Sequence, residues 1–203
     1  MLALVLGSLA AASVQAQQQP APPPVPCQSR AVGKPWHGRL VCGVQLPADG
    51  DTFVTWNFPL HRSPNDAFRR WGTSQLVAYV EQIAADYRTR FGPGPRLVIG
   101  DLSRPHGGSF GKKYGGLGHA SHQNGLDVDI AYPRIDGLER PPDTPNQIDR
   151  VRAQWLVDRA ARDAQFVFIG LHVHLRRHFK RVQLLAFHDD QMHVRIPKPA
   201  PVP

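Results

Sequence analysis

Cysteine is scarce in this chain, with only Cys27 and Cys42 among 203 residues. So few cysteines exclude multi-cysteine zinc modules, and a thiol-based catalytic site is not expected. Aromatic residues make up only 8% of the chain, and no basic stripe interleaved with aromatics is present. Nucleic-acid binding is therefore disfavoured. The net charge of +8 still favours an anionic partner, and an acidic cell-wall polymer fits that charge better.

Long apolar runs are also missing, apart from the N-terminal stretch LALVLGSLAAASV. This stretch has the length of a signal-peptide core and is too short to cross a bilayer. Val14-Gln15-Ala16 follows the small-residue pattern of a cleavage site. We therefore predict a signal peptide over residues 1–16, a periplasmic or secreted protein and no stable membrane insertion. In an oxidising compartment Cys27 and Cys42 are expected to form a disulfide.

The 20 prolines are concentrated at the two ends of the chain. QQQPAPPPVP after the signal peptide and PKPAPVP at the end are typical of extended linkers. We predict a linker over 17–36, one domain over 37–196 and a Pro-rich tail over 197–203. The length and the 41% hydrophobic content suit a single globular domain that buries its own core.

Hydrophobic periodicity predicts a mixture of helices and strands. One helix is expected to be capped by Thr73-Ser74 and to end at Gly92. A second is expected to begin at Thr144-Pro145, which has the form of a capping box, and to continue through Ile148, Val151, Trp155 and Leu156. Short apolar runs predict strands over 96–100, 126–130, 166–169 and 192–196. The expected fold class is α+β, with a small antiparallel sheet flanked by helices and long loops, including a Gly-rich loop over 103–118.

Two short runs concentrate histidine and aspartate: GHASHQNGLDVDI (118–130) and HDDQMHVRI (188–196). Clustered nitrogen and oxygen donors suit a divalent metal such as zinc. In the first run Asp127 and Asp129 alternate with apolar residues, so both acids are expected on one face of a strand. Gly125 gives the chain the freedom to bend from the preceding loop into that strand. The sequence therefore predicts a metal site on the sheet.

The first run contains the H-x-x-G-x-x-x-D core of a motif found in the lysostaphin, D-Ala-D-Ala carboxypeptidase and hedgehog-type group of zinc peptidases. With VIGDLSRPHGG before it and MHVRI near the end, the chain most closely resembles the penicillin-insensitive murein endopeptidase family. The resemblance covers about residues 68–134 together with MHVRI, and no alignment is made over 135–185.

The resemblance implies one catalytic zinc ion held by His122, Asp129 and His193. Three protein ligands leave a coordination position for a water, as in catalytic zinc sites. His119 is expected to line the site. Asp127 shares a strand face with Asp129, and is expected either to hydrogen-bond a ligand or to be solvated.

Gln191 departs from the family pattern, in which a histidine at this position acts as the general base. An amide cannot accept a proton near neutral pH, so Gln191 is expected only to line the site and to hydrogen-bond substrate. Asp190 is the predicted base, on the pattern of the carboxypeptidase branch. A regular strand would point Asp190 away from His193, so this role requires a turn just before Met192. His188 is the alternative base, and a protein that binds without cleaving is the third possibility.

Arg104 follows the predicted strand over 96–100, where the carboxypeptidase branch carries an arginine. Its fixed charge suits an oxyanion or a substrate carboxylate, although a solvated loop arginine is the alternative. The resemblance thus implies a zinc metallopeptidase that hydrolyses an amide bond of peptidoglycan, such as the D-alanyl-diaminopimelate bond. A carboxypeptidase-like murein peptidase, a catalytically silent zinc-containing cell-wall-binding protein and a hedgehog-type signalling ligand are the alternatives.

Overall fold

The structure of the protein, a computed structural model, describes residues 27–112 and 119–199. The predicted signal peptide and most of the predicted tail lie outside these residues. Within the described part, no helix has the length and apolar character needed to cross a bilayer.

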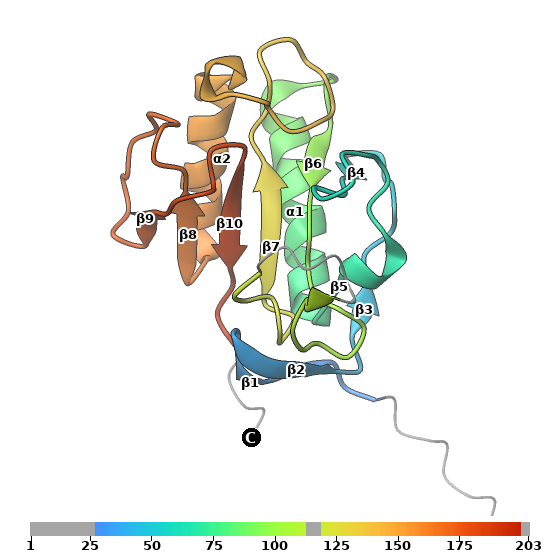
Figure 1. The fold of residues 1–203 in the computed structure, drawn as a ribbon. Helices are drawn as coiled ribbons and strands as arrows, with labels where there is room; N and C mark the ends of the chain where they lie inside the picture. Colours follow the sequence, from blue (N-terminus) through green and yellow to red (C-terminus); the bar gives the residue numbers. More distant parts are fainter. Residues whose placement is uncertain (1–26, 113–118, 200–203) are drawn as a thin grey trace, which may run out of the picture.

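A six-stranded sheet forms the centre of the molecule (Figure 1). In spatial order its strands are β4 (Phe53–Thr55), β6 (Leu97–Ile99), β7 (Asp127–Ala131), β10 (Gln191–Arg195), β8 (Phe166–Ile169) and β9 (Val182–Leu184). The four central strands are antiparallel, whereas β4 and β9 pair in parallel with their neighbours at the two edges. The α+β class is confirmed, but the sheet is mixed. Parallel pairing at β4–β6 follows from the intervening helix α1 (Ser74–Phe91), because a parallel pair needs a long crossover.

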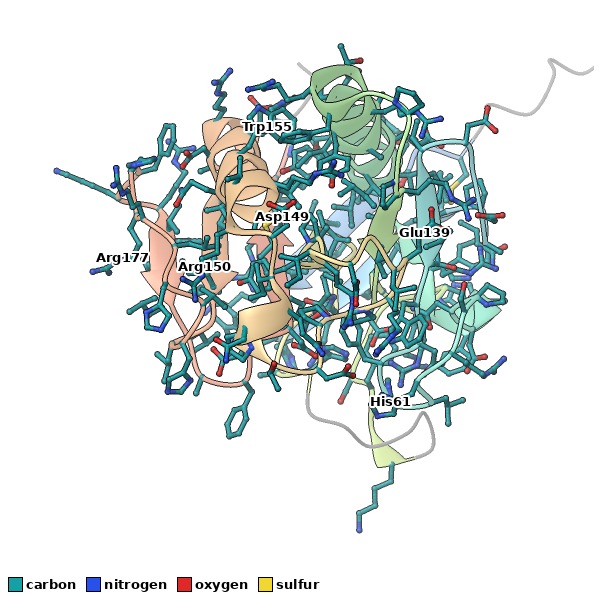
Figure 2. All side chains as sticks on the ribbon, turned by 90° about the horizontal axis from the view of Figure 1, so that it is seen from above. His61, Glu139, Asp149, Arg150, Trp155 and Arg177 are labelled. Carbon is teal, nitrogen blue, oxygen red and sulfur yellow. A yellow bond between two sulfur atoms is a disulfide. The ribbon has the colours of Figure 1, made fainter. Side chains whose placement is uncertain are left out.

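Both long helices, α1 and α2 (Arg150–Asp163), cover the same face of the sheet (Figure 1). Alternate residues of the two central strands form the core beneath them: Val128 and Ile130 of β7, and Met192 and Val194 of β10. Trp155 of α2, labelled in Figure 2, packs against α1, and its ring centroid lies 5.4 Å from that of Phe91. Among the described residues neither α-helix lies on the opposite face of the sheet, which leaves that face available for a site.

Helix α1 has the predicted ends. The Thr73 side chain accepts a hydrogen bond from the Leu76 amide (3.2 Å), and Gly92 closes the helix with a φ of 74°. A positive φ at this point favours glycine because it lacks a Cβ.

Helix α2 begins later than predicted. Thr144 makes no capping hydrogen bond, and Pro145–Gln147 form only a 3₁₀ turn. The cap is Asp149, whose Oδ1 accepts from the amides of Val151 (3.1 Å) and Arg152 (3.0 Å). Ile148 lies before the helix in extended backbone, and Val151 is 76% exposed, so neither belongs to its buried face.

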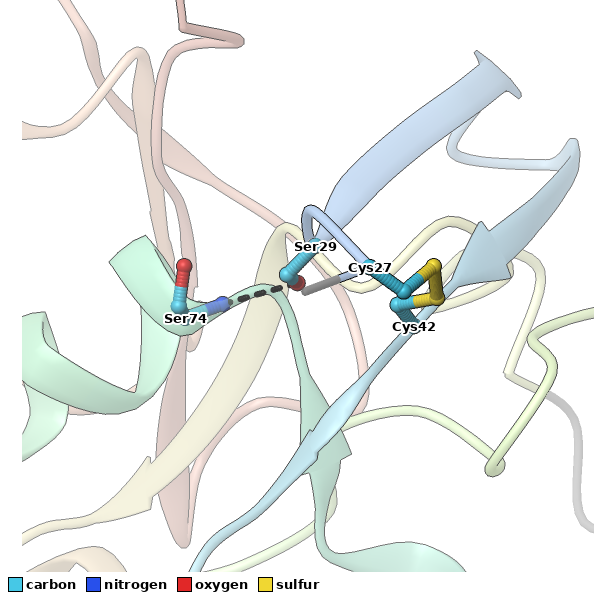
Figure 3. The surroundings of a disulfide bond; sticks show 4 residues. All are labelled: Cys27, Ser29, Cys42 and Ser74. Carbon is cyan, nitrogen blue, oxygen red and sulfur yellow. Dashed lines mark hydrogen bonds between the residues drawn. A yellow bond between two sulfur atoms is a disulfide. The ribbon is translucent and has the colours of Figure 1, made fainter. Parts of the chain in front are cut away.

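The N-terminal part of the described chain is a hairpin of β1 (Arg30–Lys34) and β2 (His37–Val41). The predicted Cys27–Cys42 disulfide is present and closes this hairpin (Figure 3). Next to it, the Ser29 hydroxyl accepts a hydrogen bond from the Ser74 amide at the start of α1 (3.0 Å). The predicted linker over 17–36 is therefore too long at its C-terminal end, because residues 30–36 are part of the folded hairpin. A two-stranded pair, β3 (Val44–Gln45) with β5 (Trp71–Gly72), and a 3₁₀ turn, Ala67–Arg69, complete the fold.

Candidate metal centre

The strand pair β7–β10 brings two of the predicted metal ligands together on the helix-free face. His193 lies directly opposite Asp129 in the antiparallel register, and its Nδ1 is 3.0 Å from Asp129 Oδ1. His122, from the loop before β7, places Nε2 at 3.1 Å from His193 Nδ1 and 3.4 Å from Asp129 Oδ1. The donor atoms of the three predicted ligands thus face one another at a buried point.

The backbone around His122 explains how this loop residue enters the site. His122 has a φ of 66°, which is strained for a side chain other than glycine, and its amide donates to Asp127 Oδ2 (3.1 Å). Gly125 has a φ of 77°, and a Cβ there would lie 2.8 Å from Leu40 Cδ1. The predicted bend at Gly125 is therefore confirmed, and both its positive φ and the close approach of Leu40 favour glycine there.

The outer nitrogen of each histidine has its own partner. His122 Nδ1 lies 2.7 Å from the Leu102 carbonyl oxygen, which can only accept. His193 Nε2 lies 3.1 Å from Asp127 Oδ1, and Arg195 Nε donates to the same oxygen (2.6 Å). Outer partners of this kind fix the ring orientation of metal-binding histidines and leave the inner nitrogens for a cation.

The two carboxylates of the cluster are held in the ionised form, which suits a cation. Burial alone would raise the pKa of the Asp127 carboxyl, but the hydrogen bond from His193 and its charge hold it at about 2. Burial lowers the pKa of His193, yet the hydrogen bonds to Asp127 and Asp129 outweigh it and raise this pKa to about 9, so a metal ion that binds the inner nitrogen displaces a proton from it. Among the described residues, no hydrogen bond reaches Asp129 Oδ2, although this oxygen is buried. Two imidazoles and a carboxylate with an unsatisfied oxygen fit a divalent cation such as zinc.

His119 is the fourth member of the cluster. The metal-binding atoms of His119, His122 and Asp129 lie within 4.8 Å of one another, and His119 Nδ1 is 3.7 Å from Asp129 Oδ2. The other nitrogen of His119 is 2.6 Å from Asp101 Oδ2. His119 therefore lines the site, as expected, and can itself offer a nitrogen to a metal.

Asp101 was missed by the sequence analysis. It is fully buried two residues after the end of β6, forms an ion pair with the buried Arg69 and accepts from Asn65 Nδ2 (2.9 Å). A charged residue shortly after a buried apolar strand was the only signal in the sequence, and it does not specify a partner.

Two cavities adjoin the cluster. The first, which we name the metal-side cavity, has a volume of about 880 Å³ and is lined by Asp129, His188, Gln191 and His193 among others. The second, the charged cavity, has a volume of about 610 Å³ and is lined by residues that include His61, Arg140, Asp189 and Asp190. His119 and Phe187 line both cavities, so the two meet beside the cluster. His61 is labelled in Figure 2, where it lies at the margin of the molecule.

The two predicted bases lie in different cavities. Burial lowers the pKa of His188, whose ring centroid is 6.1 Å from that of His193. Burial raises the pKa of Asp190 to about 6, but this residue continues the strand pairing, since its carbonyl accepts from the Tyr132 amide (3.2 Å). The turn just before Met192 that the role of Asp190 required is absent, because Gln191 is already paired with Ala131.

The remaining predicted and unassigned residues lie outside the cluster. Arg104 donates to the Ser109 carbonyl (2.7 Å) and does not line either cavity. His172 pairs with Asp189 (2.7 Å), and His178 with Asp158 (2.9 Å), both at the surface. The H-x-H sequence His172-Val173-His174, which could in principle bind a metal, therefore does not join this cluster.

Comparison with known proteins relates the chain to one family. Residues 31–175 match the family model of the penicillin-insensitive murein endopeptidases. The chain is 33% identical over 144 residues to the penicillin-insensitive murein endopeptidases of Salmonella arizonae, Salmonella paratyphi B and Salmonella newport, which is 71% of this chain and 45% of each relative. The aligned part thus spans less than half the length of these relatives. The family match includes His122 and Asp129 and ends before His193. On this match, the chain belongs to the penicillin-insensitive murein endopeptidase family.

Proposed function

We propose that the protein is a zinc-dependent murein endopeptidase that cleaves an amide bond in the peptide part of peptidoglycan. The observation that carries the proposal is the convergence of His122 Nε2, Asp129 Oδ1 and His193 Nδ1 within 3.4 Å of one another at a buried point beside two cavities. Family membership supports the substrate class.

His122, Asp129 and His193 would hold the zinc ion, with His119 close enough to assist. When bound, zinc supplies a water of lowered pKa and polarises the scissile carbonyl. The chain supplies the orientation of the ligands: the Leu102 carbonyl and Asp127 keep the outer imidazole nitrogens protonated, so that the inner nitrogens remain available.

The proposed bond is D-alanyl-diaminopimelate, in which the stem on one side carries a carboxylate and an amine. The charged cavity offers Arg140 to a carboxylate, and Asp189 and Asp190 to an amine. Two cavities that meet beside the cluster give room for a substrate that extends beyond the scissile bond, which supports internal over terminal cleavage. The disulfide and a murein substrate together support a location outside the cytoplasm.

We propose His188 as the general base, because the turn before Met192 that the predicted base Asp190 requires is absent. His188 Nδ1 lies 2.7 Å from the Ala186 carbonyl oxygen, which can only accept, so the ring proton resides on Nδ1. His188 Nε2 is then free to take a proton in the metal-side cavity and to return it to the leaving amine. The lowered pKa keeps this imidazole neutral at neutral pH.

A catalytically silent murein-binding protein is the second candidate, and Gln191 is the observation that favours it. Gln191 occupies the strand face of His193 with its Oε1 buried, and no hydrogen bond to this oxygen is present within the described residues. An amide there can bind substrate but cannot accept a proton.

Product analysis of muropeptides after incubation with the full chain separates these two functions. The zinc-loaded protein is expected to release stem-peptide products, the chelated protein none, and metal analysis is expected to find about one zinc per chain. Replacement of His193 by Ala is expected to remove both zinc and activity, whereas His178→Ala, a surface histidine paired with Asp158, is expected to retain both. Zinc binding without products from any cross-linked murein would leave only the silent protein.

A further inference from the structure

Phe187 is the most exposed large apolar side chain among the described residues, at 95% of its surface. It lies in the segment between β9 and β10 and lines both the metal-side cavity and the charged cavity. Exposure of a large aromatic ring to water is unfavourable. An exposed ring at the junction of two cavities is therefore a candidate binding residue.

The backbone at Phe187 is also unusual. Its φ of 63° lies in the left-handed region, which costs a phenylalanine free energy that a glycine would not lose. The same turn places the neighbouring His188 towards the site, where Nδ1 contacts the Ala186 carbonyl oxygen. The chain therefore keeps a strained conformation that directs His188 inward and leaves the Phe187 ring in solvent. Strain of this kind gathers at functional sites.

Other exposed apolar side chains converge on the same place from a distant segment. Trp36, in the turn of the β1–β2 hairpin, is 55% exposed and lines the metal-side cavity together with Leu185. Two segments far apart in the sequence thus contribute apolar surface around one opening. Contiguous apolar surface beside a polar site is typical of a binding surface.

We infer that Phe187 contacts the murein peptide directly and sets the affinity for it, with its ring against the stem where the stem passes from one cavity to the other. This inference rests on the proposed function. The alanine methyl groups of the stem would pack on the ring, while the charged ends of the stem extend into the charged cavity beside Arg140 and Asp189.

The test measures both binding and cleavage with the full chain. Calorimetric titration of the chelated protein with a purified cross-linked muropeptide dimer gives Kd, and the zinc-loaded protein gives KM and kcat on the same dimer. Phe187→Ala is expected to raise Kd and KM by about tenfold with kcat nearly unchanged, and Phe187→Tyr is expected to restore wild-type values. Leu184→Ala, which removes a 45% exposed side chain outside both cavities, is the matched control and is expected to behave as wild type.

A glycine variant separates binding from structure. Phe187→Gly relieves the left-handed backbone, so its free energy of unfolding is expected to equal or exceed that of wild type while Kd rises as in the alanine variant. Wild-type Kd and KM in Phe187→Ala would overturn the inference. Failure of the proposed function appears differently, as a wild-type protein that releases no products although the Kd values can still be compared.

Discussion

His193 is held between two carboxylates of the same strand, with Nδ1 3.0 Å from Asp129 Oδ1 and Nε2 3.1 Å from Asp127 Oδ1. Asp127 and Asp129 are two residues apart on β7, so they share a face, and the antiparallel register sets His193 beside both. The ring of His193 is therefore oriented by a residue that need not touch the metal.

Replacement of Asp127 by Asn should test this orientation. The amide keeps the size of the side chain but loses the charge that favours a proton on His193 Nε2. We expect zinc affinity to fall by about 10–100-fold, as measured by competition with a chromophoric chelator. Asp158→Asn is the matched control, because Asp158 is also paired with a histidine, His178, away from the centre. An affinity within twofold of wild type in Asp127→Asn would show that the ring is held by packing alone.

Gln191→His should raise turnover. Gln191 lies on the strand face of His193 and lines the same cavity, so an imidazole there could accept a proton. A positioned general base contributes about 10²-fold or more, and we expect kcat to rise by about that factor in muropeptide assays. The companion change His188→Ala should then harm the Gln191→His protein much less than the wild type. An unchanged kcat in Gln191→His, with full dependence on His188 retained, would assign proton transfer to His188 alone.

Glu139→Gln should destabilise the loop that borders the charged cavity. Glu139, labelled in Figure 2, accepts from Arg96 Nη2 (2.7 Å) and Nε (3.0 Å). Both side chains are nearly a third exposed, so we expect a loss of about 1 kcal/mol at pH 7 in urea unfolding. Glu81→Gln, on the exposed surface of α1, is the control.

The effect of Glu139→Gln should depend on pH with a defined sign. The hydrogen bond from Arg96 lowers the pKa of Glu139 in the folded protein. The stabilisation is therefore fully present above the pKa of the unfolded side chain, about 4.3, and is lost as the pH falls through the lower folded value. Unfolding curves of wild type and variant should converge below about pH 4. A constant difference between pH 7 and pH 3 would mean that packing, not charge, is lost.

Asp149→Ala should cost about 1 kcal/mol of unfolding free energy, because Asp149 caps two amides at the start of α2. Thr144→Ala, at the residue that the sequence suggested as the cap, should change stability by less than about 0.5 kcal/mol. Thermal and urea unfolding of the two variants measure this directly. Equal losses would indicate that the 3₁₀ turn nucleates the helix.

The starts of α1 and α2 show which helix boundaries local sequence can predict and which it cannot. Thr73 and Thr144 both precede helix-compatible sequence, but only Thr73 accepts a capping bond. Before α2 the chain is drawn into extended backbone by contacts with distant residues: Ile148 bridges to Arg134, and the Asp149 amide donates to the Pro133 carbonyl (2.8 Å). Contacts of this kind are absent from the local pattern, so the later start was not predictable.

Part of the candidate site could likewise be predicted from local sequence, and part of it could not. One local motif contains His122, Gly125 and Asp129, and its spacing predicts the bend between the loop and the strand. The hydrophobic pattern predicts the α+β class. The pairing of His193 with Asp129 depends on the register of β7 and β10, which is set by the whole sheet. Asp101 and Phe187 lie beside the site only because of the tertiary fold, so the sequence alone could not identify them.

The Cys27–Cys42 disulfide links the N-terminal hairpin, and through it the candidate metal centre, to the redox state of the compartment. The hairpin supports the loop that carries His122, because the Gln123 amide donates to the Pro35 carbonyl (2.9 Å) and the Leu40 amide to the His106 carbonyl (3.0 Å). Cys27 and Cys42 tie the two ends of that hairpin together. In a reducing cytosol the cross-link does not form, and the platform beneath His122 depends on noncovalent contacts alone. In an oxidising compartment the disulfide completes this platform, so the assembly of the candidate centre depends on the redox state of its surroundings.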